Sequence, residues 1–149
     1  MKRYWKKATA LFVTLVFLTA AITIPAGAVT GRSSLYLSRY RAWLTPVSGA
    51  KINVNVDVQA VDDMDDVGAL SITMFESTDG GTTWDSDGTY ASVLHPNMLD
   101  HATYIYYDTA VVHQGTAGYK YYAVVTVYAG DSTGSDTRDY VTPTVTARS

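Results

Sequence analysis

The chain of 149 residues contains no cysteine. This absence excludes a disulfide scaffold, a thiolate metal site, a cysteine nucleophile and a lipid anchor attached to cysteine. Glutamate is almost absent as well, with Glu76 as the single example, and beyond residue 28 leucine and lysine are few. Threonine, valine, tyrosine and aspartate are common instead. That composition disfavours helices and favours strands joined by turns.

Residues 1–28 have the pattern of a secretory signal peptide. An uncharged segment, residues 8–24, is followed by Ala26 and Ala28 in the A-x-A pattern of a cleavage site. The positive start of the segment contains Lys2, Arg3, Lys6 and Lys7. We expect cleavage after Ala28 and export from a Gram-positive bacterium. A retained membrane anchor is the alternative, because about 17 apolar residues are the lower limit for crossing a bilayer.

Removal of this leader changes the charge of the protein. The leader contains four basic residues and no acid, so the net charge changes from −3 to −7 and 121 residues remain. A net charge of −7 opposes binding to nucleic acid or to an anionic membrane. We therefore expect an extracellular protein or a glycan as partner. Residues 29–34 are expected to be a flexible N-terminus, and residues 35–149 one domain whose core is stable without disulfides.

Strict alternation marks the clearest strand, residues 51–61. Polar residues alternate there with five apolar ones, Ile52, Val54, Val56, Val58 and Ala60. Residues 119–129 are apolar on both faces, which indicates a central strand. Five further segments have strand composition: residues 35–44, 69–76, 82–90, 103–112 and 138–147. Seven short strands separated by turn residues predict an antiparallel β-sandwich.

The segment that begins at Gly115 adds a resemblance to this pattern. Tyr119, with Tyr121 at the position of the usual second cysteine, resembles the tyrosine corner of immunoglobulin-like sandwiches. Residues 119–129 are similar to strand F of fibronectin type III domains. The resemblance implies an all-β, immunoglobulin- or fibronectin type III-like sandwich of about seven strands. The pattern of residues 1–28 predicts a signal-peptide helix before it.

Residues 77–84 match the Asp-box pattern S-x-D-x-G-x-T-W through Ser77, Asp79, Gly81 and Trp84. The match resembles the Asp-box hairpins of sialidase-type propellers and other secreted proteins. We expect Asp79 to accept hydrogen bonds from turn amides, Gly81 to allow a positive φ, and Trp84 to fold over the turn. A propeller needs repeated copies and only one is present, so the resemblance implies a structural hairpin.

Four aspartates form the densest charge cluster: Asp62, Asp63, Asp65 and Asp66. Carboxylates suit calcium, but the spacing is not that of an EF-hand loop. We expect a solvated acidic loop between two strands, with Met64 and Val67 directed into the core. Calcium binding by the four aspartates is the alternative, and no other cofactor or metal is predicted.

The remaining titratable residues do not form a recognisable catalytic motif. His95, Asp100 and His101 have the chemistry of zinc ligands, but they lie in one connector without a further ligand cluster. His113 stands apart from them, and Glu76 as a general acid is less favoured than Glu76 as a solvated surface residue. Because no nucleophile or phosphate-binding motif is present either, we expect a protein that is not an enzyme.

Tyrosine is the remaining functional signal. It suits half-buried positions with an apolar ring and a wet hydroxyl, and an exposed strip of tyrosines would stack on sugars or anchor a protein. Cross-strand pairing of tyrosine is the alternative explanation. The candidate ligand platform consists of Tyr104, Tyr106, Tyr107, Tyr122 and Tyr128.

Several segments together resemble small exported proteins of unknown function from gut clostridia. The segments are 54–58, 64–68, 76–84 and 121–123. The resemblance implies no activity. We predict a secreted, non-catalytic binding or interaction module, with a carbohydrate-binding module that uses exposed Tyr and Trp as the alternative. A small extracellular hydrolase is the second alternative, and it would require a cleft with two carboxylates about 5–10 Å apart.

Overall fold

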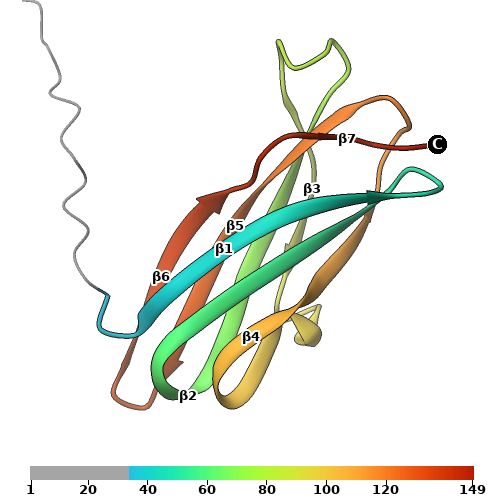
Figure 1. Cartoon of the computed structure of the whole chain (residues 1–149). Coiled ribbons are helices and arrows are strands. Elements are labelled where there is room, and N and C mark those ends of the chain that lie inside the picture. The colour runs from blue at the N-terminus through green and yellow to red at the C-terminus, as the bar shows by residue number, and fades with distance from the viewer. Residues whose placement is uncertain (1–33) are drawn as a thin grey trace, which may run out of the picture. The chain divides into compact units, whose positions relative to one another are not determined.

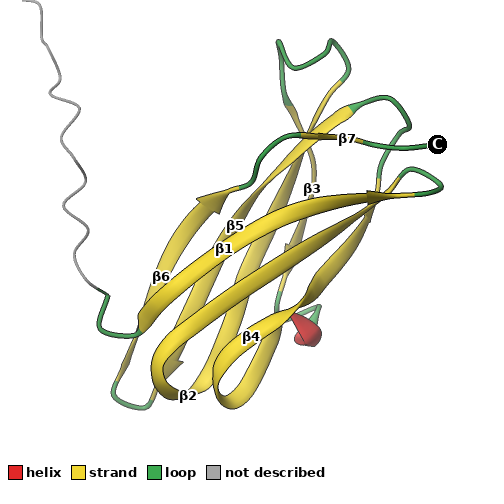
Figure 2. Cartoon of the chain, viewed as in Figure 1, coloured by secondary structure: helices red, strands yellow, loops and turns green. Residues whose placement is uncertain are grey.

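The computed structural model describes residues 34–149, so the predicted signal peptide lies outside the described residues. The described chain is built from antiparallel strands and one short 3-10 helix (Figures 1 and 2). The elements are β1 (Leu37–Val47), β2 (Lys51–Ser77), β3 (Asp85–Ala91), η1 (Pro96–Met98), β4 (Leu99–Gln114), β5 (Lys120–Asp131), β6 (Gly134–Val141) and β7 (Val145–Thr146). The predicted all-β, antiparallel fold is confirmed. Within residues 34–149, no helix is long and apolar enough to span a membrane.

Strand β2 is the centre of the seven-stranded sheet. Residues 51–60 of β2 pair with β1 on one side and with β4 on the other. Residues 66–77 pair with β5, and part of this segment also pairs with β3. Figure 1 shows β2 bending near its label, so that the sheet folds back on itself. We call β1, residues 51–60 and β4 the first half, and β3, residues 66–77, β5 and β6 the second half.

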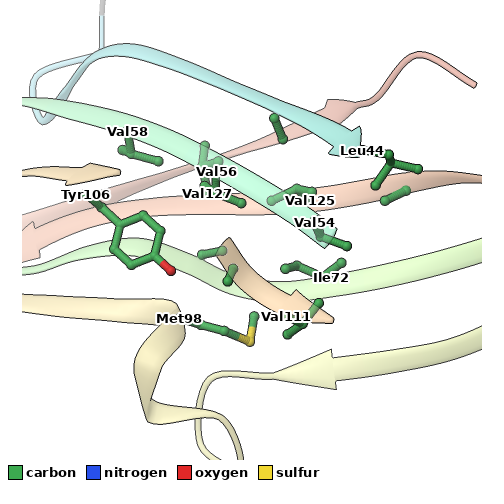
Figure 3. Close-up of a cluster of buried hydrophobic side chains, with 14 of the residues drawn as sticks. Leu44, Val54, Val56, Val58, Ile72, Met98, Tyr106, Val111, Val125 and Val127 are labelled. Atoms are coloured by element: carbon green, nitrogen blue, oxygen red, sulfur yellow. The ribbon is translucent and has the colours of Figure 1, made fainter. Parts of the chain in front are cut away.

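The core lies between the two halves (Figure 3). Alternate residues of β2 point inward, and Val54, Val56 and Val58 are fully buried. Ile72 and Val125 of the second half are equally buried, as are Met74 and Val127. Burial of each such side chain contributes about 1.5–3 kcal/mol, so the packing between the two halves makes a large contribution to stability.

The acidic segment is the main correction to the predicted elements. Residues 51–61 and 69–76 were expected as separate strands joined by a loop that contains Asp62–Asp66. They are one strand, and β4 pairs with it on both sides of an irregularity in the ladder: Gln59 lies opposite Ile105 before the irregularity, and Met64 opposite Thr103 after it. Met64 and Val67 are buried, as predicted.

The last predicted strand, residues 138–147, is divided into β6 and β7. Pro143 has no N–H to donate, so the regular ladder ends before it. At Thr142 the side chain replaces part of the ladder: its Oγ1 accepts a hydrogen bond from the Ala123 N–H at 2.9 Å. The Thr142 N–H in turn donates to the Ala123 carbonyl oxygen.

A buried tyrosine anchors the beginning of β5. The Thr116 N–H donates to the hydroxyl oxygen of Tyr121 at 2.8 Å, and this hydroxyl donates to Glu76 Oε2 at 3.0 Å. The contact to the preceding loop was expected from Tyr119, but the structure shows it at Tyr121. Tyr121 lies on the core side of β5 and is fully buried, whereas Tyr119 precedes the strand.

Gly68 is required where η1 packs against β2. Its φ is +149°, and a Cβ there would collide with the Met98 carbonyl oxygen and lie 3.1 Å from the Tyr106 ring. We predict that Gly68→Ala lowers the free energy of unfolding by about 3 kcal/mol or more, because backbone strain and overpacking add. Gly118→Ala is the matched control, since its φ is +86° with open space around it, and it should cost only about 1–2 kcal/mol. Urea denaturation measures both; equal losses would contradict the steric argument.

Tyr121→Phe tests the corner. Removing the hydroxyl leaves the Thr116 N–H without its partner, so we predict a loss of about 1–2 kcal/mol. Tyr119→Phe removes a hydroxyl from the neighbouring, partly buried tyrosine and should change stability by less than about 0.5 kcal/mol. Thermal unfolding followed by circular dichroism compares the two variants. A larger loss of stability in Tyr119→Phe would show that Tyr119, and not Tyr121, makes the stabilising contact to the preceding loop.

Candidate ligand-binding face

The solvent side of the first half gathers charged, amide and aromatic side chains. Register places Arg41 beside Asp57 and Asp57 beside Tyr107, and it places Trp43 beside Asn55. Because side chains alternate along each strand, these residues share the face opposite the core. We define the outer face by its six main residues, Arg39, Arg41, Trp43, Asn55, Asp57 and Tyr107.

Asp57 occupies the middle of the outer face and is only 1% exposed. Its Oδ2 accepts a hydrogen bond from Arg41 Nε at 2.8 Å and lies 3.6 Å from Arg39 Nη2. Its Oδ1 is buried and has no hydrogen-bond partner among residues 34–149. A buried acceptor without a hydrogen bond lowers the stability of the fold by about 1–3 kcal/mol, so a group that donates to this oxygen would be favoured.

Two aromatic rings flank this carboxylate from neighbouring strands. Trp43 of β1 and Tyr107 of β4 have ring centroids 6.0 Å apart, with their planes tilted by 44°. The Arg41 guanidinium carbon lies 5.1 Å from the Trp43 ring centroid, within cation–π range. Tyr107 is 63% exposed, so most of its side chain is open to a ligand.

Asn55 holds the face rigid. Its Nδ2 donates to Thr45 Oγ1 at 2.9 Å, and its Oδ1 accepts from Thr109 Oγ1 at 2.8 Å. The side chain therefore connects β1, β2 and β4 in addition to their backbone ladders. A face built on three paired strands positions its functional groups more accurately than loops do.

The predicted tyrosine platform does not assemble on one face. Tyr106 is 1% exposed and lies in the core, where its hydroxyl donates to the Asn97 carbonyl oxygen at 2.8 Å. Burial, with smaller effects from Asp108 and Asp100, raises the pKa of Tyr106. Tyr106 is therefore not available to a ligand.

The other four predicted tyrosines are divided between the two halves. Tyr107 belongs to the outer face, while Tyr104, also exposed, lies on β4 outside this face. Tyr122 and Tyr128 belong to β5 in the second half. The alternation of β4 explains why the adjacent residues 106 and 107 point in opposite directions.

Sequence reasoning missed the partners of Tyr107. Alternation placed Asp57 on the polar face of residues 51–61, which was a usable signal. Nothing local indicated that Arg41 and Trp43 lie beside this strand, because the register of β1 against β2 is a tertiary property.

A second aromatic group lies in the second half. Phe75 stacks on Tyr122 at 4.9 Å with planes 8° apart, and Trp84 meets the same Tyr122 edge-on at 4.7 Å. Trp84 thus folds onto the sheet beside the turn that precedes it. These rings are half-buried against one another, which fits cross-strand packing.

The turn before Trp84 satisfies its own polar groups. Asp79 Oδ1 accepts hydrogen bonds from the N–H groups of Thr82 and Thr83 and from Ser77 Oγ, and Oδ2 accepts from Thr83 Oγ1 at 2.7 Å. Ser77 Oγ accepts from the Gly81 N–H at 2.8 Å, and the φ of Gly81 is +103°. The bonds from Thr83, then that from Ser77, hold the pKa of Asp79 far below its usual range.

The acidic and histidine residues meet in one pair and do not converge on a metal site among residues 34–149. His101 Nδ1 lies 2.5 Å from Asp66 Oδ1, and Asp62 Oδ1 accepts from the Asp63 N–H. His95 instead packs edge-on against Tyr90 at 5.3 Å. In the part of the chain that the structure describes, no three His, Cys, Asp or Glu side chains are grouped to hold a metal ion.

His113 forms a buried relay that sequence reasoning did not find. Its Nε2 lies 2.8 Å from Asp87 Oδ2, and its Nδ1 lies 2.9 Å from the Tyr90 hydroxyl. With Nε2–H donating to the carboxylate, Nδ1 accepts from Tyr90. Burial, and then Asp87, raises the pKa of Tyr90. The two hydrogen bonds of His113 connect β3 to β4.

Of these groups, the outer face alone combines an exposed aromatic side chain with the buried, unpartnered oxygen found within residues 34–149. It is therefore the candidate site. Comparison of the chain with protein-family models, curated proteins and solved structures gives no match.

Asp79 makes an acid-dependent contribution to stability. Its folded pKa lies below the value of about 4 for an unfolded aspartate, so its contribution is present above pH 4 and is lost as the pH falls below that. We predict that Asp79→Asn lowers the melting temperature at pH 7 and shows a smaller further decrease between pH 5 and pH 2 than the wild type. Differential scanning calorimetry at both pH values measures this; parallel curves for the two proteins would contradict it.

Proposed function

We propose that the protein is a secreted, non-catalytic binding module of a Gram-positive bacterium and that the outer face is its binding surface. The signal-peptide pattern of residues 1–28 supports the location. The observation that carries the proposed function is Asp57, a buried carboxylate with one unpartnered oxygen, on a solvent-facing sheet beside Tyr107.

The energetic cost at Asp57 favours a ligand. Solvent-facing sheet positions normally hold solvated side chains, whereas carboxylates are almost never fully buried without complete pairing. The side chains of Arg39 and Arg41 are 59% and 55% exposed. Water would solvate both of them even if Asp57 were absent, so they do not by themselves require a buried carboxylate. Tyrosine, tryptophan and arginine are the residue types enriched at binding hot spots, and on this face Tyr107 is exposed while Trp43 is half-buried.

The strand pairing supports an immunoglobulin- or fibronectin type III-like sandwich as the scaffold. The order β1–β2–β4 in the first half and β3–β2–β5–β6 in the second divides the fold into groups of three and four strands. Such a division is expected of a fibronectin type III domain, with its second and third strands here continuous as β2. The buried Tyr121 at the start of β5 supports the same assignment.

Tyr107→Ala tests the proposed function. Because Tyr107 is exposed, the variant should fold normally and lose at least tenfold in binding to intact cells of the producing bacterium or to arrayed extracellular proteins and glycans. Tyr104→Ala is the matched control, an exposed tyrosine of the same strand outside the outer face. Fluorescently labelled purified proteins give the affinities.

Equal binding by the wild type and Tyr107→Ala would exclude the outer face as the binding surface. Absence of saturable binding by the wild type to every one of these targets would contradict the proposed function itself.

A further inference from the structure

We infer that the outer face binds a single glycan chain, whose sugar rings pack on Trp43 and Tyr107 and one of whose hydroxyl groups donates to Asp57 Oδ1. This inference rests on the proposed function and names its ligand class. It follows from three properties of the face: the polar side chains along β2, the Asp57 oxygen that lacks a hydrogen-bond donor, and the tilt between the rings of Trp43 and Tyr107.

The central row of the face is entirely polar. Asn55, Asp57 and Gln59 follow one another on the solvent side of β2. An apolar protein surface would remove water from this row without replacing its hydrogen bonds, which is costly. A sugar hydroxyl both donates and accepts, so a glycan replaces the water and keeps these groups paired.

Asp57 Oδ1 restricts the chemistry further. A carboxylate oxygen is only an acceptor, so its partner must bring a hydrogen atom. A hydroxyl group meets this demand, whereas a phosphate or sulfate oxygen does not. Because Oδ1 is buried, a neighbouring side chain must move before a sugar hydroxyl can contact it. The Arg39 guanidinium, largely exposed and 3.6 Å from Oδ2, is held less firmly than that of Arg41.

Arg39 then provides the complementary donors. Its guanidinium carries five N–H groups and no acceptor, so it suits the ring and hydroxyl oxygens of a sugar. Asp57 and Arg39 together therefore bind one hydroxyl-rich unit through both of its hydrogen-bonding functions.

The aromatic pair indicates the form of the glycan. Rings tilted by 44° cannot both lie flat against one planar surface such as a crystalline polysaccharide. They match consecutive sugar units of a single chain whose ring planes rotate along its length. The C–H faces of such units are the apolar surfaces that the exposed Tyr107 ring and the half-buried Trp43 ring beside Arg41 accept.

Affinity gel electrophoresis with the purified protein tests this inference. The probes are soluble mixed-linkage β-glucan, xylan, galactomannan, pullulan and homogalacturonan, with insoluble cellulose as the planar surface. We expect at least one soluble chain to retard the wild type and cellulose not to bind it. Tyr107→Ala should weaken binding at least tenfold, while Tyr107→Phe, which keeps the ring, should stay within about threefold of the wild type.

Asp57→Asn tests the hydrogen bond, with Tyr104→Ala as the unaffected control. Loss of the carboxylate should weaken binding at least tenfold, and circular dichroism establishes that the variant is folded. If it is not folded, Arg39→Ala replaces it, because the exposed arginine donates to the same sugar unit; binding within twofold of the wild type would overturn the assignment.

Two further results would overturn the inference and leave the proposed function standing. The first is loss of cell or protein binding in Tyr107→Ala without retardation of the wild type by any polysaccharide. The second is wild-type binding to cellulose as tight as to any soluble chain. Polysaccharide binding that survives both Tyr107→Ala and Asp57→Asn would instead place the glycan on another surface.

Discussion

The pairing of β2 with neighbours along both of its edges is the constraint on which the structure depends. A buried backbone must have its N–H and C=O groups hydrogen-bonded, and β2 meets this requirement with β1, β3, β4 and β5. One register also decides which side chains face inward. A slip of one residue would put Asp57 into the core and expose Val56 and Val58, so the core and the outer face are two results of the same alignment.

The local sequence pattern predicts which residues of a strand are buried, but it does not predict which distant strands lie side by side. Alternation in residues 51–61 predicts both the buried valines and the polar side of the strand, because a period of two is a property of neighbouring residues. The strand across Asp62–Asp66 depends on pairing with a distant β4, so an acidic run resembled a loop. Trp43 and Tyr107 meet although more than sixty residues separate them in the sequence, and no local signal connects them.

Two aspartates show how similar side chains serve different purposes. Both oxygens of Asp79 receive donors from its own turn, so this carboxylate is fully used in shaping the hairpin. Asp57 instead contacts two arginines through Oδ2, yet its Oδ1 stays unpaired inside a face that is otherwise well connected through Asn55. The two carboxylates differ in whether both oxygens have a hydrogen-bond donor. This difference, more than residue type or charge, distinguishes the structural Asp79 from Asp57, the candidate for function.

The His113 relay has a consequence for the edges of the sheet. Among the described residues, β3 and β4 each pair only with β2, so each leaves one row of backbone groups unpaired. Such rows are templates on which another chain can add a strand. Asp87, His113 and Tyr90 close the seam between these two edges with side chains. These bonds join the two edge strands, and edges held in this way are less available for pairing with a strand of another chain.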